Sequence, residues 1–165
     1  MGENEINVTV GTKSGPISAL ELADFLYLFD FCYFMTVQII RSKDVGSIVS
    51  ESDLRRLAQD IAKDIEQYHQ AVQKDGGLYV DLLERYDSTH AYHLTLKSIF
   101  RENPTHFIFY AMLPPVAAVA LIVGGIFSLN AKTIVFPDLK TTNKLLRNLI
   151  PDSFKKRKLT KFRKD

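Results

Sequence analysis

The sequence predicts an α+β fold: two long helices packed on a small two- or three-stranded sheet, followed by an apolar helical segment and a basic C-terminal tail. Three observations predict it. Short stretches alternate apolar and polar residues, two long stretches begin with helix-capping residues, and residues 107–129 contain no charged side chain. With 165 residues, of which 46% are hydrophobic and 24% charged, the composition is typical of one globular domain.

Strands are predicted at three places. Apolar residues alternate with polar ones over residues 5–10 and again over residues 91–100, and His106–Met112 is long enough to return as a third strand. Residues 101–104 supply the turn between the last two strands. The long helices lie between the first strand and the second.

The first helix is predicted from Ala19 to Arg41, because Ser18 and Glu21 have the spacing of a capping box. Its length is sufficient to cross a bilayer, but Asp24 and Asp30 interrupt it, and a carboxylate at the bilayer centre costs about 2.5 to 3.5 kcal/mol. We therefore interpret it as a core helix. The two aspartates keep it out of the bilayer or pair with cations at a subunit contact.

The second helix is predicted to begin after Ser50, which forms a second capping-box pair with Asp53. Apolar residues then recur at intervals of three and four over about 24 residues, until Gly76 and Gly77 end the stripe. A short helix from Leu78 to Tyr86 is expected to continue the packing.

The apolar segment from Phe107 to Leu129 is long enough to span a bilayer as a helix. Pro114 and Pro115 lie inside it, and a helix that began before them would kink. The uninterrupted part, residues 116–129, has a length typical of a core, re-entrant or interfacial helix. Three placements stay open: a full span, a shallow insertion, or burial between the subunits of an oligomer.

Small residues in this segment indicate a close helix contact. Ala120 and Gly124 have the four-residue spacing that lets two helices approach closely, and Gly125 follows directly. A tightly packed core helix has the same pattern. In either case so apolar a surface predicts self-association.

Charge divides the chain into three regions. Residues 1–106, the acidic α+β body, have 10 Lys and Arg against 16 Asp and Glu, a net charge of −6. Residues 107–129 are uncharged, and the basic C-terminal region, residues 130–165, has 11 against 3, a net charge of +8. In the last region 133–136 are β-prone, and Thr141 or Thr142 is expected to cap a helix that ends at Leu149.

The C-terminal tail is the strongest candidate for binding an anionic partner. Basic residues alternate there with Phe154, Leu159 and Phe162, which suit a membrane interface or stacking on single-stranded bases. A solubilising tail with no partner is the third alternative. The candidate binding residues are Lys155, Lys156, Arg157, Lys158, Lys161, Arg163 and Lys164.

The sequence contains no recognisable catalytic or metal-binding signature. Cys32, the single cysteine, lies among aromatic residues and has the setting of a buried apolar side chain. His90 and His93 would point in opposite directions at the start of a strand, and Gly11–Gly15 lacks the spacing of a phosphate-binding loop. We expect no enzyme activity, no cofactor, no metal and no small-molecule substrate.

These observations favour a non-enzymatic, homo-oligomeric, membrane-associated protein, such as a membrane effector, whose tail binds anionic headgroups. The alternative is a soluble oligomeric nucleic-acid-binding or scaffold module that buries the apolar segment between subunits. The N-terminus lacks the basic and apolar regions of a secretory signal, so we expect the cytoplasmic side of a membrane, or the cytoplasm in the alternative.

Overall fold

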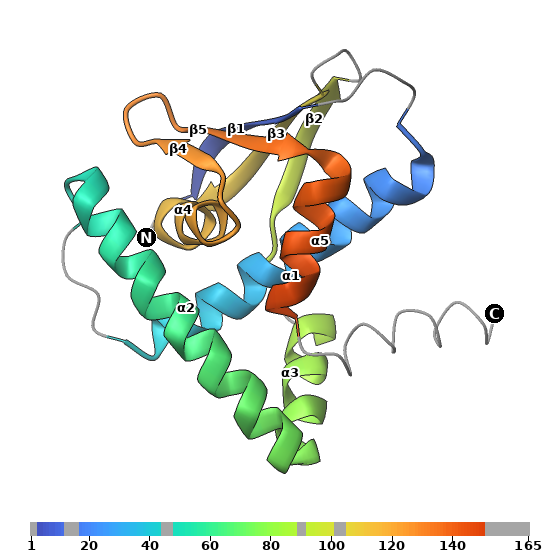
Figure 1. Ribbon diagram of the computed structural model, residues 1–165, viewed down its shortest axis with the longest axis vertical. Helices are drawn as coiled ribbons and strands as arrows, with labels where there is room; N and C mark the ends of the chain where they lie inside the picture. The colour runs from blue at the N-terminus through green and yellow to red at the C-terminus, as the bar shows by residue number, and fades with distance from the viewer. Residues whose placement is uncertain (1–2, 12–16, 44–47, 89–91, 101–104, 151–165) are drawn as a thin grey trace.

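The computed structural model describes residues 3–11, 17–43, 48–88, 92–100 and 105–150 (Figure 1). The described chain is a mixed α+β fold with a five-stranded sheet. The elements in chain order are β1 (Glu3–Gly11), α1 (Ala19–Arg41), α2 (Glu51–Lys74), α3 (Gly76–Ser88), β2 (Thr95–Phe100), β3 (Thr105–Met112), α4 (Leu113–Ile122), β4 (Ile126–Ser128), β5 (Thr133–Asp138) and α5 (Leu139–Leu149).

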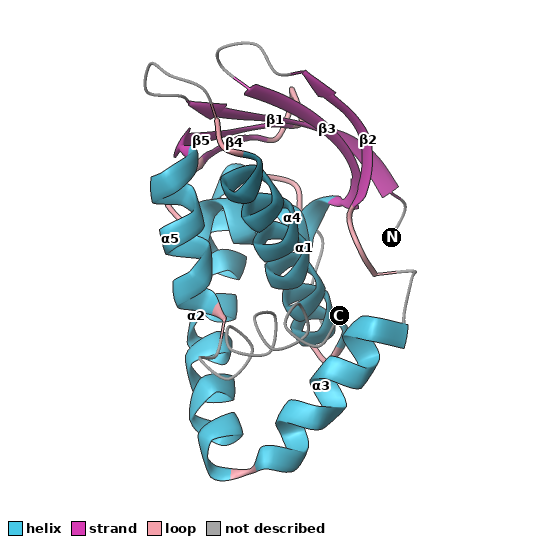
Figure 2. Cartoon of the chain, turned by 90° about the vertical axis from the view of Figure 1, so that its right-hand side faces the viewer, coloured by secondary structure: helices cyan, strands magenta, loops and turns pink. Residues whose placement is uncertain are grey.

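The sheet has the strand order β2-β3-β1-β5-β4, so the first strand of the chain lies at its centre. β1 pairs antiparallel with β3, with Ile6 opposite Phe109, and parallel with β5, with Val8 opposite Ile134. In the described part of the chain the helices all lie on one side of the sheet (Figure 2). The sheet therefore has one face in the core and one face that these helices leave uncovered.

The core lies between the inner face of the sheet and α1. Phe25 and Phe29 of α1 are fully buried and stack on each other with ring centroids 5.5 Å apart. Phe107 of β3 lies 5.0 Å from Phe25, and Phe136 of β5 lies 5.6 Å from Phe29. Because aromatic pairs at such distances add to the burial of apolar area, α1 is held against both sides of the central strand.

Local signals predicted the long helices closely. α1 has the expected bounds, with the Ser18 side chain accepting the Glu21 backbone N–H at 3.0 Å. α2 begins with the expected reciprocal capping box between Ser50 and Asp53. The hydrogen bonds to the Asp53 carboxylate, first that from the Val49 backbone, hold its pKa below the ordinary value.

The expected two- or three-stranded sheet was too small, because residues 126–128 and 133–138 add two strands. Residues 92–94, expected to open a strand, precede β2. α2 ends at Lys74 and α3 begins at Gly76, so the glycines open the next helix. α5 begins three residues earlier than expected, because the Asp138 side chain accepts the Thr141 backbone N–H at 2.8 Å and acts as the N-cap.

The expected apolar helical segment is divided among three elements. Residues 107–112 belong to β3, residues 113–122 form α4, and residues 126–128 form β4. Within α4 the side chains from Pro115 to Ala120 are buried inside this single chain. The prediction of one helical segment is therefore wrong, because the backbone of its first part is used for pairing with β1.

α1 is the one described helix with the length and apolar composition of a membrane span. Of its most apolar stretch, 61% is buried inside the fold. Since core helices of this kind meet the same criteria, the burial supports the interpretation of α1 as a core helix.

Candidate functional site

The residues expected to contact lipid or another subunit lie in α4 and directly after it. Pro114 and Pro115 lie in its first turn, where a proline needs no backbone N–H donor, so they start the helix and do not kink it. Ala120 is fully buried. The described part of the chain thus places Pro115 and Ala120 in its own core, while Pro114 is half-buried.

Gly124 and Gly125 end α4 as a Schellman motif. The Gly125 N–H donates to the Ala120 carbonyl at 2.8 Å, the Gly124 N–H donates to the Leu121 carbonyl at 3.2 Å, and Gly124 has a φ of +78°. A Cβ on Gly125 would lie 3.0 Å from both the Ala120 carbonyl oxygen and the Phe136 ring. The glycines expected to permit helix association therefore have a local role in stopping the helix and turning the chain into β4.

The candidate anion-binding residues of the tail, from Lys155 to Lys164, lie outside the described residues, as do residues 12–15 of the glycine-containing loop and the turn 101–104. The last described residue, Ile150, is buried, and α5 before it contacts α1 through an ion pair between Arg147 and Asp24 with a 2.7 Å N–O distance. The point from which the tail continues is therefore fixed to the body.

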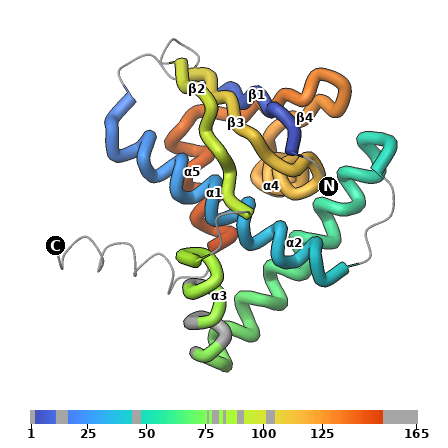
Figure 3. The backbone as a smooth tube through the Cα atoms, turned by 180° about the vertical axis from the view of Figure 1, so that it is seen from behind, coloured from blue at the N-terminus to red at the C-terminus, as the bar shows by residue number. Residues whose placement is uncertain are grey.

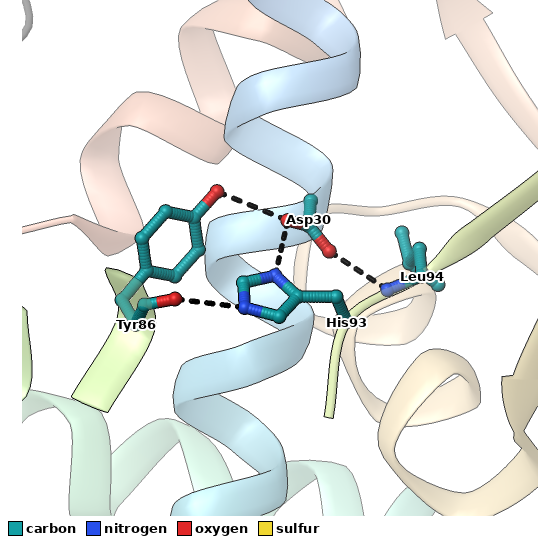
Figure 4. A network of polar contacts seen from close by, with 4 residues as sticks. All are labelled: Asp30, Tyr86, His93 and Leu94. Carbon is teal, nitrogen blue, oxygen red and sulfur yellow. Dashed lines mark hydrogen bonds and ion pairs between the residues drawn. The ribbon is translucent and has the colours of Figure 1, made fainter. Parts of the chain in front are cut away.

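Asp30 lies at the centre of a polar network that sequence reasoning missed (Figure 4). Its Oδ2 accepts the Tyr86 hydroxyl at 3.0 Å and lies 2.7 Å from Nδ1 of His93, while its Oδ1 accepts the Leu94 backbone N–H at 2.8 Å. Nε2 of His93 lies 2.9 Å from the Tyr86 carbonyl oxygen. The carboxylate of α1 thus joins the end of α3 to the segment that leads into β2.

The network is enclosed by aromatic rings. The Tyr86 ring lies 4.9 Å from Phe31 and 5.4 Å from Phe34, and the His93 ring stacks on Phe34 at 5.4 Å. Burial, followed by the nearby Asp30 charge, raises the pKa of the Tyr86 phenol. Tyr86 therefore stays protonated at neutral pH and donates to Asp30.

The geometry assigns this network a structural role. A histidine that acts as a general base or binds a metal needs a ring nitrogen with an available lone pair. Both nitrogens of His93 face acceptors of this chain, Asp30 and the Tyr86 carbonyl. Within the described residues no group of three or more His, Cys, Asp or Glu side chains is placed to hold a metal ion.

Cys32 and His69 both contact backbone carbonyls of α5. Cys32 is fully buried, and burial, followed by the Asp30 charge, raises the pKa of its thiol. His69 of α2 lies with Nε2 2.7 Å from the Leu149 carbonyl oxygen at the end of α5. Asp24 and Asp30, expected to pair with cations of another subunit, instead contact Arg147 and His93 of this chain.

The uncovered sheet face presents a row of residues across all five strands. The pairing register places Phe100, His106, Thr9, Val135 and Ile126 side by side along it. Three of them are large apolar residues with substantial exposure: 52% for Phe100, 46% for Val135 and 70% for Ile126. Residues 133–136 were expected to be β-prone and lie in β5, but no local pattern predicted β4 or the pairing that adds both strands to this face.

No family model, curated protein or solved structure matches this chain. Its class is therefore defined by the fold alone: a mixed α+β domain with a five-stranded sheet covered by helices on one face in the described residues.

Proposed function

We propose that this chain is a non-enzymatic, homo-oligomeric protein that binds the anionic cytoplasmic surface of a membrane through its basic C-terminal tail. The observation behind this proposal is the separation of charge: residues 1–106 have a net charge of −6 and residues 130–165 a net charge of +8. Because anionic headgroups attract basic clusters and repel acidic ones, such a chain binds with its tail toward the surface.

Burial of the apolar segment shapes the mode of binding. The side chains from Val116 to Ala120 are fully buried in the chain's own core, so they are not available to lipid in this conformation. Electrostatic attraction to the tail, with Phe154 and Phe162 entering the interface, is then the principal attachment. This is peripheral association, and it replaces the expected insertion of residues 107–129.

The uncovered sheet face supports the homo-oligomeric part of the proposal. Val135 and Ile126 lie side by side as exposed apolar residues on β5 and β4, and Phe100 is exposed on β2 at the opposite edge, with His106 and Thr9 between. Exposed apolar side chains on an uncovered face favour association. Several copies joined through it would present several basic tails, and their avidity would exceed the affinity of a single tail.

Vesicle flotation of the full chain tests the proposal. Binding is expected to vesicles of phosphatidylcholine with phosphatidylserine and not to phosphatidylcholine alone. Changing Lys155, Lys156, Arg157 and Lys158 to Gln should weaken binding about a thousandfold, since each basic residue near the surface contributes about 1 kcal/mol. Equal binding to neutral vesicles, or binding unaffected by the four changes, would contradict it.

A matched control removes four positive charges from the body. Arg55, Arg56, Lys63 and Lys74 are exposed on α2 within the acidic body, so their change to Gln should leave most of the binding intact. Single-stranded polynucleotide added to the same assay separates the alternative function. If the polynucleotide binds the tail while the anionic vesicles do not, nucleic-acid binding replaces membrane binding as the proposed function.

A further inference from the structure

Two parts of the chain far apart in the sequence, α1 and the region from α3 to β2, meet at Asp30. Tyr86 lies near the C-terminal end of α3, His93 and Leu94 lead into β2, and Asp30 lies in the middle of α1 (Figures 3 and 4). The Asp30 and His93 side chains are 20% and 21% exposed, so water reaches the pair while most of its surface is enclosed.

The two hydrogen bonds of the His93 ring require one proton more than neutral His93 and ionised Asp30 have between them. A backbone carbonyl only accepts, so Nε2 of His93 must present an N–H to Tyr86. The 2.7 Å contact between Nδ1 and Asp30 Oδ2 then needs a second proton, located on either atom. Neutral His93 beside ionised Asp30 has one proton too few, and one of the two contacts becomes a repulsion between lone pairs.

Other charged and titratable groups face the pair from each packed element. On α1 these are Tyr27, whose ring lies 6.2 Å from Tyr86, and Cys32, which the Asp30 charge affects. On α3 the Asp87 charge acts on Tyr86. Next to His93, Tyr92 lies under the Arg41 guanidinium at 4.5 Å. Since Tyr27, Cys32 and Tyr86 are neutral near pH 7, the proton shared by Asp30 and His93 dominates the response in that range.

We propose that Asp30 and His93 form a proton-dependent latch that holds the C-terminal end of α3 against α1. With the shared proton, Asp30 binds Tyr86, His93 and Leu94 together. Loss of that proton releases His93 and the Tyr86 carbonyl from each other, so the end of α3 separates from the Phe31 and Phe34 rings. The latch regulates the exposure of this aromatic face of α1, and it does not depend on the function proposed for the tail.

The arrangement of α3 makes local opening feasible. α2 and α3 meet at the end of the fold farthest from the sheet (Figure 2), and Tyr86 near the C-terminal end of α3 contacts α1 (Figure 4). Tyr86 supplies ring contacts and a hydrogen bond there, and Leu82, one turn before it on α3, is buried. Opening of one end of a helix requires less free energy than unfolding of the whole domain.

Amide hydrogen exchange of the full chain at about pH 6 and pH 8.5 tests the latch, because histidine changes charge between about pH 5 and 8. After correction for the intrinsic pH dependence of exchange, residues 76–88 should exchange at least about tenfold faster at the higher pH, while β1 and β3 do not change. Equal corrected rates in residues 76–88 would overturn the proposal.

The Asp30→Asn variant distinguishes the effect of the shared proton on hydrogen exchange from the effect of side-chain packing. An asparagine amide can donate to the lone pair of neutral His93, so the contact no longer needs the shared proton and the exchange of residues 76–88 should lose its pH dependence. His106→Gln is the matched control: His106 is exposed on β3 and bonds Thr9 at 3.0 Å, so the variant should retain the wild-type difference. A retained difference in Asp30→Asn would refute the latch.

Nitrogen NMR of the unmodified protein covers the case in which Asp30→Asn does not fold. The His93 ring signals should change over the same pH range in which exchange of residues 76–88 accelerates. If the His93 signals change while exchange does not, the pair titrates without acting as a latch and the proposal fails.

Discussion

The Tyr33 hydroxyl oxygen accepts the backbone N–H of Met112 at 2.8 Å and so connects α1 to the junction between β3 and α4. Met112 is the N-cap residue of α4, and its own side chain makes no capping hydrogen bond. A buried phenol from another helix therefore satisfies a donor at the point where the apolar segment changes from strand to helix.

Tyr33→Phe should lower the free energy of unfolding by about 1 to 3 kcal/mol, because the Met112 N–H loses its partner in a partly buried setting. Denaturant unfolding followed by circular dichroism measures the change. Tyr92→Phe is the control: its ring can still stack under Arg41, so a change below about 0.5 kcal/mol is expected. Equal effects of the two substitutions would contradict the role of the Met112 contact.

Alkaline pH should destabilise the fold through Tyr33. Burial raises the pKa of Tyr33 from its ordinary value of 10 to about 12, because the charged phenolate is poorly solvated there. The folded state favours the neutral phenol, so this stabilisation is complete below pH 10 and is lost as the pH rises from 10 to 12. Ultraviolet absorbance of tyrosinate should show a late-titrating fraction that decreases in Tyr33→Phe; an unchanged fraction would exclude this assignment.

Gly124→Ala should destabilise the fold by about 1 to 2 kcal/mol, since an alanine at a φ of +78° is strained even where space is available. Gly124→Asn should cost less, because asparagine tolerates this conformation. Thermal unfolding of the two variants measures the order. If both variants unfold at the same temperature as the wild type, the Schellman motif at the end of α4 is not important for stability.

Charges on the uncovered sheet face should dissociate the proposed oligomer. Phe100→Asp and Ile126→Asp place carboxylates on the two edge strands at positions already exposed, so the fold should persist. Sedimentation should then give the 18.8 kDa monomer in place of a larger species. Leu20→Asp is the control, because Leu20 is 71% exposed at the start of α1, away from the sheet pairing; an oligomer that survives the sheet variants would place the contact elsewhere.

Local signals predicted α1 and α2, because the capping residues and the spacing of apolar residues that define a helix lie within or next to the helix itself. The sheet was underestimated because the pairing of Val8 with Ile134 joins residues far apart in the chain, and alternation alone does not specify a partner. The Asp30 network was missed for the same reason. A carboxylate in an aromatic helix signals the need for a partner, but Tyr86 and His93 lie 56 and 63 residues away.

The central position of β1 determines the order in which the molecule can be completed during synthesis. Of the five described strands β1 is made first, yet one of its partners is β5, which ends at Asp138. Until that residue has left the ribosome, the sheet lacks a central pairing and the aromatic side of α1 lacks Phe136. Native contacts of such long sequence separation fold slowly. The nascent chain therefore passes through a period in which the aromatic helix α1 is incompletely covered, when a chaperone that binds aromatic segments would protect it.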